Sequence, residues 1–126
     1  MNADLIERNT AAHRNGEFCE KYAREVIPGL EWKNGIYDAL LNGVPLDVKS
    51  CQAWYKRLNH PTSTRKAGMV TLYPEQDAEL KEHHGLYFCI VHFGELVVKS
   101  FFVPAEKVPD RRQISWTTLQ KLAVVV

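Results

Sequence analysis

Two aspartates and a lysine lie around a short turn in the first half of the chain. Asp38 precedes the dipeptide Asn42-Gly43, and Asp47 and Lys49 follow it. Asn-Gly between two apolar runs favours a tight β-hairpin, because both residues tolerate the positive φ of a type I′ turn. Carboxylates that face each other across a hairpin can bind a divalent cation, and a nearby lysine can orient or deprotonate water, or offset charge on a phosphoryl group. This set of residues indicates metal-assisted phosphoryl chemistry.

The turn determines which residues lie opposite each other. If Leu41 faces Val44 next to the turn, Asp38 faces Asp47. Pro45 then occupies a non-hydrogen-bonded position, where its missing N–H costs the ladder nothing. Asp38 and Asp47 form the closer, non-hydrogen-bonded kind of pair, with Cβ atoms about 4.5–5.5 Å apart. Their negative charges repel unless a cation lies between them.

Side chains alternate between the faces of a strand, which divides the hairpin into two sets. One set is apolar and is predicted to face the core: Tyr37, Ala39, Leu41, Val44, Leu46 and Val48. The other places Lys49 on the same side as Asp38 and Asp47. We expect a divalent cation bound by the two carboxylates and the main-chain carbonyl of Val48. The alternative is a surface hairpin in which Lys49 forms an ion pair with one of the aspartates.

A third acid is predicted on an N-terminal helix, expected from about residue 3 to residue 27. Its apolar stripe has helical spacing and consists of Phe18, Cys19, Tyr22, Ala23, Val26 and Ile27. Glu20 lies at the margin of this stripe, whereas Glu17 lies further towards solvent. Since a carboxylate at the edge of a packed face can reach a neighbouring strand, we expect Glu20 to assist the metal directly or through water. An exposed helix glutamate is the alternative.

The remaining pattern predicts one mixed sheet covered by helices. Further strands are expected at 30–32, 69–72, 86–93 and 96–103, the last two joined through Gly94-Glu95 as a type II′ turn. A helix is expected from Pro74 to about His84 with Gly85 as its C-terminal cap, and short helices at 105–108 and 115–122. This order predicts an α/β fold in a single domain spanning residues 1–126.

Basic and aromatic residues follow the strand that carries Lys49. From Cys51 to Val70 every charged side chain is basic, although the whole chain has a net charge of only +1. Basic residues neutralise phosphates and aromatic rings stack on unpaired bases. The predicted DNA-binding residues are Trp54, Tyr55, Lys56, Arg57, Arg65 and Lys66, with Arg111-Arg112 as a second candidate. A solvated loop is the alternative.

Composition limits the class of protein. A chain of 126 residues with 45% apolar residues suits one domain with its own core. It contains no membrane-length apolar run and no secretion signal at its start, so we expect a cytoplasmic protein without a membrane partner. Three widely spaced cysteines argue against a disulfide framework. His83, His84, Cys89 and His92 are not expected to form a zinc site, because Cys89 and His92 project to opposite faces of one strand.

Asp38 and the Asp47-x-Lys49 motif on adjoining strands resemble the signature of the PD-(D/E)xK nuclease superfamily, with Tyr37 in place of the proline. The chain is similar to the archaeal Holliday-junction resolvase branch in length, in the segment from Gly16 to Lys21 and in the element order after the active site. The resemblance covers about two thirds of the chain.

The resemblance implies a restriction endonuclease-like fold and a DNA endonuclease that uses Mg²⁺, with Mn²⁺ able to substitute. It implies that Asp38, Asp47 and Glu20 serve the metal and that Lys49 positions the nucleophile. It further implies a homodimer that cuts branched DNA symmetrically. The alternatives are a small restriction-like or repair endonuclease, and a non-catalytic DNA- or protein-binding module with a nuclease-like fold.

Overall fold

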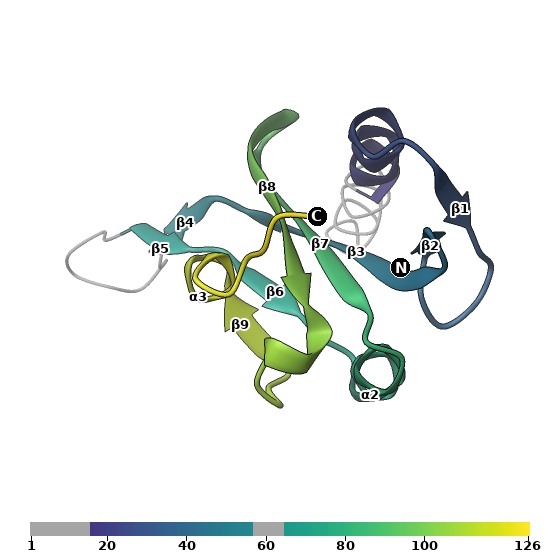
Figure 1. The fold of residues 1–126 in the computed structure, drawn as a ribbon. Coiled ribbons are helices and arrows are strands. Elements are labelled where there is room, and N and C mark those ends of the chain that lie inside the picture. The colour runs from purple at the N-terminus through teal and green to yellow at the C-terminus, as the bar shows by residue number, and fades with distance from the viewer. Residues whose placement is uncertain (1–15, 57–64) are drawn as a thin grey trace, which may run out of the picture.

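A five-stranded mixed sheet forms the centre of the protein in the computed structural model, which describes residues 16–56 and 65–126 (Figure 1). Its strand order is β1-β2-β3-β7-β8. The strands are β1 (Leu30–Trp32), β2 (Ala39–Leu41), β3 (Val44–Gln52), β7 (Leu86–Phe93) and β8 (Leu96–Pro104). Only the pairing of β3 with β7 in this sheet is parallel. The predicted α/β class and mixed sheet are confirmed.

The hairpin of β2 and β3 has the predicted turn and register. Asn42 and Gly43 have φ values of 52° and 84°, as a type I′ turn requires. Leu41 pairs with Val44, and Leu40 pairs with Pro45. The pairing of β2 with β3 ends at Ala39, so Asp38 lies just beyond the last paired residue.

The connection from β3 to β7 contains four further elements, as a parallel crossover demands. Strands β4 (Trp54–Lys56) and β5 (Arg65–Ala67) form an antiparallel pair. Strand β6 (Met69–Thr71) pairs with β9 (Gln113–Ser115). Neither β9 nor this pairing was predicted. Helix α2 (Pro74–Glu82) follows β6 and leads into β7.

Helix α2 begins with a proline and ends in a Schellman-type turn. The N–H of Gly85 donates to the carbonyl of Leu80 at 2.6 Å, and the left-handed residue is His84 with φ 54°. The prediction of Gly85 as the left-handed cap is therefore wrong by one residue. Glycine is needed at 85 for a different reason, because a Cβ there would lie 2.9 Å from the main-chain oxygen of Pro45.

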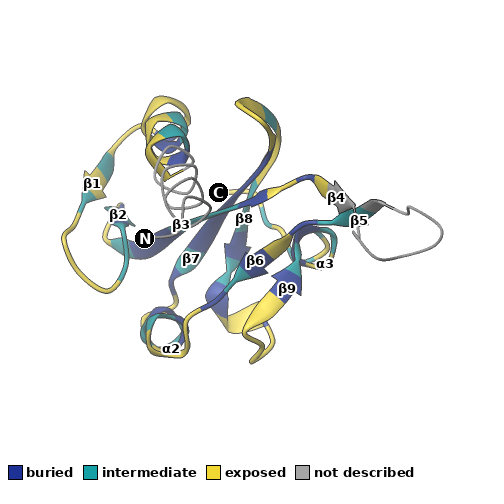
Figure 2. Cartoon of the chain, turned by 180° about the vertical axis from the view of Figure 1, so that it is seen from behind, coloured by how far each residue is buried: buried dark blue, intermediate teal, exposed yellow. Residues whose placement is uncertain are grey.

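Both faces of the sheet are covered. The helical residues 16–26 pack Cys19 and Ala23 against one face, where they meet Leu46, Phe88 and Ile90. The other face lies under α2, the 3-10 helix η1 (Ala105–Lys107) and α3 (Trp116–Gln120). Burial on both faces explains the continuous apolar run of β7, which is buried over most of its length (Figure 2).

One side chain of the hairpin lies on the face opposite to that predicted. Tyr37 was expected beside Ala39 and Leu41, but it packs against the cluster that contains Tyr87 and Cys89. Strict alternation holds only within a paired strand, and residues 33–38 do not belong to one. The other hairpin, β7–β8, has the predicted bounds within one residue, and Gly94 has the positive φ of 59° that a type II′ turn requires. No helix in the described part of the chain is long and apolar enough to cross a membrane.

Candidate active site

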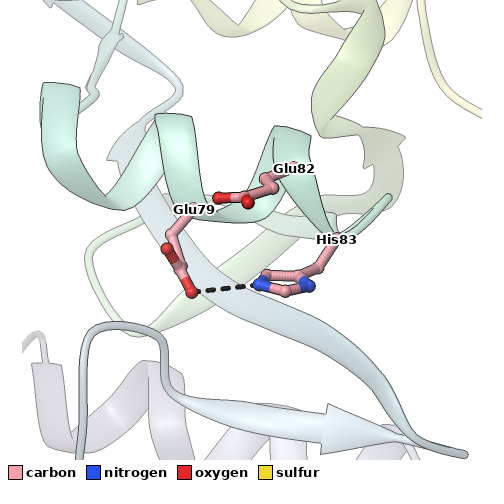
Figure 3. A group of neighbouring side chains, drawn as sticks. All are labelled: Glu79, Glu82 and His83. Atoms are coloured by element: carbon pink, nitrogen blue, oxygen red, sulfur yellow. Dashed lines mark hydrogen bonds and ion pairs between the residues drawn. The ribbon is translucent and has the colours of Figure 1, made fainter.

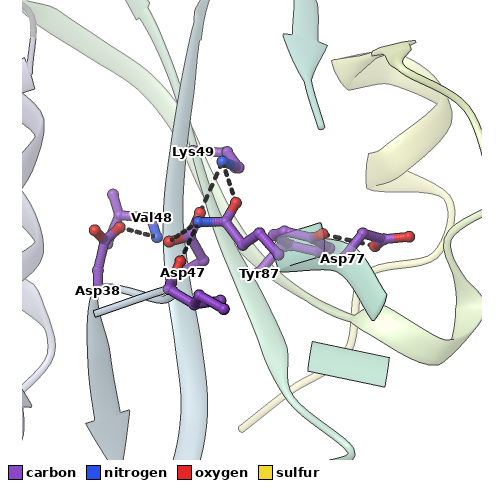
Figure 4. Close-up of polar contacts among 8 residues, drawn as sticks. Asp38, Asp47, Val48, Lys49, Asp77 and Tyr87 are labelled. Carbon is purple, nitrogen blue, oxygen red and sulfur yellow. Dashed lines mark hydrogen bonds and ion pairs between the residues drawn. The ribbon is translucent and has the colours of Figure 1, made fainter. Parts of the chain in front are cut away.

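Asp47 and Lys49 project from β3 towards the face covered by α2 (Figure 4). They alternate with Leu46 and Val48, which pack on the other face against the cluster that contains Ala23. The Nζ of Lys49 lies 2.8 Å from Oδ2 of Asp47. Asp47 is only 1% exposed. The ion pair is thus buried, which differs from the surface hairpin considered as the alternative.

The Asp38 carboxylate is fixed against the same strand by a hydrogen bond from the main chain of β3. The N–H of Val48 donates to Oδ2 of Asp38 at 2.8 Å. Burial raises the pKa of Asp47 from 3.8 to about 7, an increase that Lys49 opposes and the nearby Asp38 carboxylate reinforces. The two carboxylates therefore lie close together, although Asp38 is outside the paired part of β2. Their mutual repulsion and the burial of Asp47 create a place where positive charge is stabilising.

Gln76 of α2 completes this cluster and was not predicted. Its Oε1 accepts from Nζ of Lys49 at 2.6 Å, and its Nε2 donates to Oδ1 of Asp47 at 3.0 Å. The same Nε2 donates to the carbonyl of Ile36 at 2.7 Å. Gln76 therefore links the helix, strand β3 and the segment before Asp38. The available sequence signal was its place near the start of the helix that crosses β3, but helical spacing alone does not distinguish it from its neighbours.

A second set of hydrogen bonds fixes α2 and hence Gln76. Tyr87 is the partner of Asp47 across the parallel pair, and its hydroxyl donates to Oδ1 of Asp77 at 2.6 Å. The Nζ of Lys81 lies 2.7 Å from the other oxygen of Asp77. Burial and the Asp77 carboxylate raise the pKa of Tyr87 above its ordinary value, so this hydroxyl keeps its proton. Asp77 is itself buried, and this bond ties α2 directly to the strand beside the site.

Glu20 lies apart from this cluster. It is exposed, and the neighbouring Cys19 and Ala23 pack on the sheet face opposite Asp47 and Lys49. No hydrogen bond or ion pair joins Glu20 to Asp38 or Asp47 within residues 16–56 and 65–126. Its contribution to a metal site remains a prediction.

The donors around Asp47 fit a hard divalent cation. Asp38 and Asp47 supply carboxylate oxygens, and the carbonyl of Val48 is the predicted main-chain donor. Mg²⁺ and Mn²⁺ prefer such oxygen ligands. The burial of the Asp47 carboxylate near that of Asp38 supports the fit, because a cation would offset the cost of burying this negative charge.

A second group of possible metal ligands lies on the outer surface of α2 (Figure 3). Glu79, Glu82 and His83 offer ligand atoms within 4.8 Å of one another. Nε2 of His83 lies 3.1 Å from Oε1 of Glu79, so these two side chains already contact each other. Of the other residues considered for zinc, burial raises the pKa of the Cys89 thiol to about 12, and Nδ1 of His92 lies 3.0 Å from the carbonyl of Gly94. We assign no metal site to these groups.

The predicted DNA-binding residues lie at the far end of β3. Strands β4 and β5 pair Tyr55 with Lys66 and Lys56 with Arg65, and this hairpin is well separated from α2 in Figures 1 and 2. The Trp54 ring packs edge-on against Trp116, with centroids 5.7 Å apart. Arg57 lies outside the described residues. The structure thus places the hairpin of β4 and β5 directly after the strand that carries Lys49.

The second basic candidate borders α2. Arg111 and Arg112 line a cavity of about 310 Å³ together with Leu72, Pro74 and Lys81. Both arginines are exposed and, among the described residues, form no ion pair. They are placed on the side of α2 that carries Lys81, whereas Gln76 faces the aspartates.

Comparison with known families agrees with the fold. A family model described as a PD-(D/E)XK nuclease superfamily domain matches residues 6–121. The chain belongs to the PD-(D/E)XK nuclease superfamily. A search of curated proteins found no match. The family match extends to the superfamily as a whole and does not single out the Holliday-junction resolvase branch.

Proposed function

We propose that this protein is a Mg²⁺-dependent DNA endonuclease that hydrolyses phosphodiester bonds. Superfamily membership supports a nuclease acting on nucleic acid. The observation that carries the proposal is the burial of Asp47 between Lys49, Gln76 and the Asp38 carboxylate. A module that only bound DNA would gain little from two carboxylates at this site, because carboxylates repel phosphates.

The residues divide the chemistry between them. Asp38, Asp47 and the carbonyl of Val48 would hold Mg²⁺, which supplies Lewis-acid activation of water and of the phosphoryl group when bound. Mn²⁺ would substitute, and Glu20 would assist through water. Lys49 provides a cation that offsets negative charge on the phosphoryl oxygens and positions the attacking water. Gln76 fixes the Lys49 ammonium by accepting a hydrogen bond from it through Oε1.

We further propose a structure-specific enzyme of the Holliday-junction resolvase type, acting as a homodimer. The order of elements after β6 supports this choice, since α2, the β7–β8 hairpin and the short helix η1 follow as they do in that branch. The hairpin of β4 and β5 carries the basic residues predicted to bind DNA, and it follows the strand that carries Lys49. A small restriction-like or repair endonuclease is the principal alternative.

Cleavage of a substrate panel tests this proposal. The protein is incubated with Mg²⁺ or Mn²⁺ and end-labelled four-way junction, flap, plain duplex and single-stranded DNA. Paired symmetric nicks in the junction are expected, at a higher rate than any cutting of the flap, plain duplex or single strand. Cutting of plain duplex with a sequence preference would favour a restriction-like enzyme. Binding without cutting of any substrate would refute the nuclease proposal.

Asp47→Ala is expected to abolish Mg²⁺-dependent cleavage and to leave DNA binding intact or tighter, because the change removes a metal ligand and a negative charge facing the phosphates. Glu31→Ala is a suitable control, since Glu31 is an exposed acid on β1 paired with Lys33. Unchanged cleavage by Asp47→Ala would exclude the proposed mechanism.

A further inference from the structure

Two exposed apolar side chains border the candidate active site. Tyr73, just before α2, is 55% exposed, and its ring centroid lies 4.8 Å from Nζ of Lys49. Ile36, just before Asp38, is 51% exposed, and its carbonyl accepts from Gln76. Each residue therefore contacts a member of the Asp47–Lys49–Gln76 cluster and still presents apolar surface to solvent.

Tyr73 is exposed although the residue before it is buried. The adjacent Leu72 is 2% exposed and lies in the core, so the chain at this point can bury apolar groups. Gln76 donates to the Ile36 carbonyl and thereby fixes the backbone beside Asp38. The Tyr73 ring lies against the Lys49 ammonium. Tyr73 thus lies next to Lys49, and Ile36 next to Gln76, beside the groups that would meet a phosphodiester.

The chemistry of these two residues selects the occupant. An exposed tyrosine next to a cation suits a nucleobase attached to a phosphate, because the ring stacks on the base while the cation meets the phosphate. Isoleucine is one of the side chains that proteins insert between bases to unstack them. A fully stacked duplex keeps its bases away from such groups.

We propose that Tyr73 and Ile36 contact an unstacked nucleotide next to the bond that is cleaved, so that the enzyme prefers DNA with an unpaired base at the cleavage site. This inference rests on the proposed nuclease function. Tyr73 and Ile36 would then select the substrate, in addition to the basic hairpin of β4 and β5.

The test compares three DNA duplexes of one sequence. The first is fully paired, the second carries one unpaired nucleotide at the cleavage position, and the third carries an abasic unit there. Stacking on an aromatic ring is expected to give the unpaired-base DNA an advantage of about 5- to 100-fold over the abasic DNA. Tyr73→Ala should remove this advantage, Ile36→Ala should reduce it, and Tyr73→Phe should retain it.

The abasic duplex separates stacking from an indirect effect on Lys49. A disturbed Lys49 would slow cleavage of all three duplexes equally, whereas lost stacking slows only the cleavage of the unpaired-base DNA. Phe93→Ala is the matched control, because Phe93 is 61% exposed at the far β7–β8 turn. An equal loss on the unpaired-base and abasic duplexes in Tyr73→Ala would overturn the proposal.

A binding measurement keeps this test independent of catalysis. The unpaired position is occupied by 2-aminopurine, whose fluorescence is quenched on stacking, and the protein is added in EDTA. Quenching is expected with the wild type and Tyr73→Phe, and its absence with Tyr73→Ala. No quenching by the wild type would overturn the stacking proposal even if the protein cuts DNA. Quenching without any Mg²⁺-dependent cleavage would refute only the nuclease proposal.

Discussion

Replacing Asp47 by asparagine tests the electrostatics of the site without changing its shape. The native carboxylate is 1% exposed and has a pKa of about 7, compared with its ordinary value of 3.8. Between about pH 4 and pH 7 the Asp47 carboxyl therefore holds more proton in the folded protein than in the unfolded chain. The contribution of this proton to the free energy of unfolding is fully present below about pH 4. It is lost as the pH rises to about 7.

The magnitude follows from the two pKa values. Between pH 5 and pH 8 the wild type is expected to lose about 3 kcal/mol of unfolding free energy through Asp47 alone. Asp47→Asn has no such proton to lose. Its unfolding free energy relative to that of the wild type should therefore rise by about 3 kcal/mol between pH 5 and pH 8. Any cost of lost hydrogen bonds to Gln76 or Lys49 is present at both pH values and cancels in this comparison.

Urea denaturation in EDTA at pH 5 and pH 8 measures this difference. Asp110→Asn is the matched control, because Lys81 lowers the pKa of the exposed Asp110 and places its titration below the interval. Its stability relative to the wild type should not change between the two pH values. A constant difference between Asp47→Asn and the wild type would refute the argument. Excess Mg²⁺ at pH 8 should stabilise the wild type and not Asp47→Asn.

Three further substitutions test the groups around the site. Gln76→Ala is expected to lower the single-turnover cleavage rate at least about tenfold, because Lys49 loses its 2.6 Å acceptor. Tyr87→Phe should destabilise the protein by about 1–3 kcal/mol in urea denaturation, because buried Asp77 loses a donor. Gly68→Ala should cost about 3 kcal/mol or more, because its Cβ would lie 1.8 Å from the main-chain oxygen of Gln52.

Each of these expectations has a contrary result. Cleavage by Gln76→Ala at the wild-type rate would show that Lys49 needs no support from α2. Wild-type stability of Tyr87→Phe would mean that the contact between α2 and β7 depends on packing alone. Wild-type stability of Gly68→Ala would show that the backbone around residue 68 can move away from β3.

The hairpin at the site was predictable because its determinants are local. Asn42-Gly43 selects the turn, and the turn selects the pairing of Leu41 with Val44. The position of Lys49 on the same side as Asp47 follows from alternation along one strand. For the same reason the prediction for Tyr37 was wrong, since the strand ends at Ala39 and alternation carries no information beyond it.

Gln76 could not be predicted because its role depends on how α2 crosses β3. Its three hydrogen bonds reach residues 27 to 40 positions away in the sequence. The pairing of β6 with β9 was missed for a similar reason, since it joins Met69 to Ser115. Periodicity indicates that a short segment is extended or helical, but it does not identify the distant segment that the chain brings beside it.

The central claim is that Asp38, Asp47 and Lys49 form one metal-dependent hydrolytic site. Isothermal titration with Mn²⁺, followed by cleavage of end-labelled branched DNA, tests it most directly on the wild type, Asp38→Ala, Asp47→Ala and Lys49→Ala. The wild type should bind Mn²⁺ and cut, the two aspartate variants should lose both properties, and Lys49→Ala should bind Mn²⁺ without cutting. An aspartate variant that binds Mn²⁺ and cuts DNA as the wild type does would contradict the account.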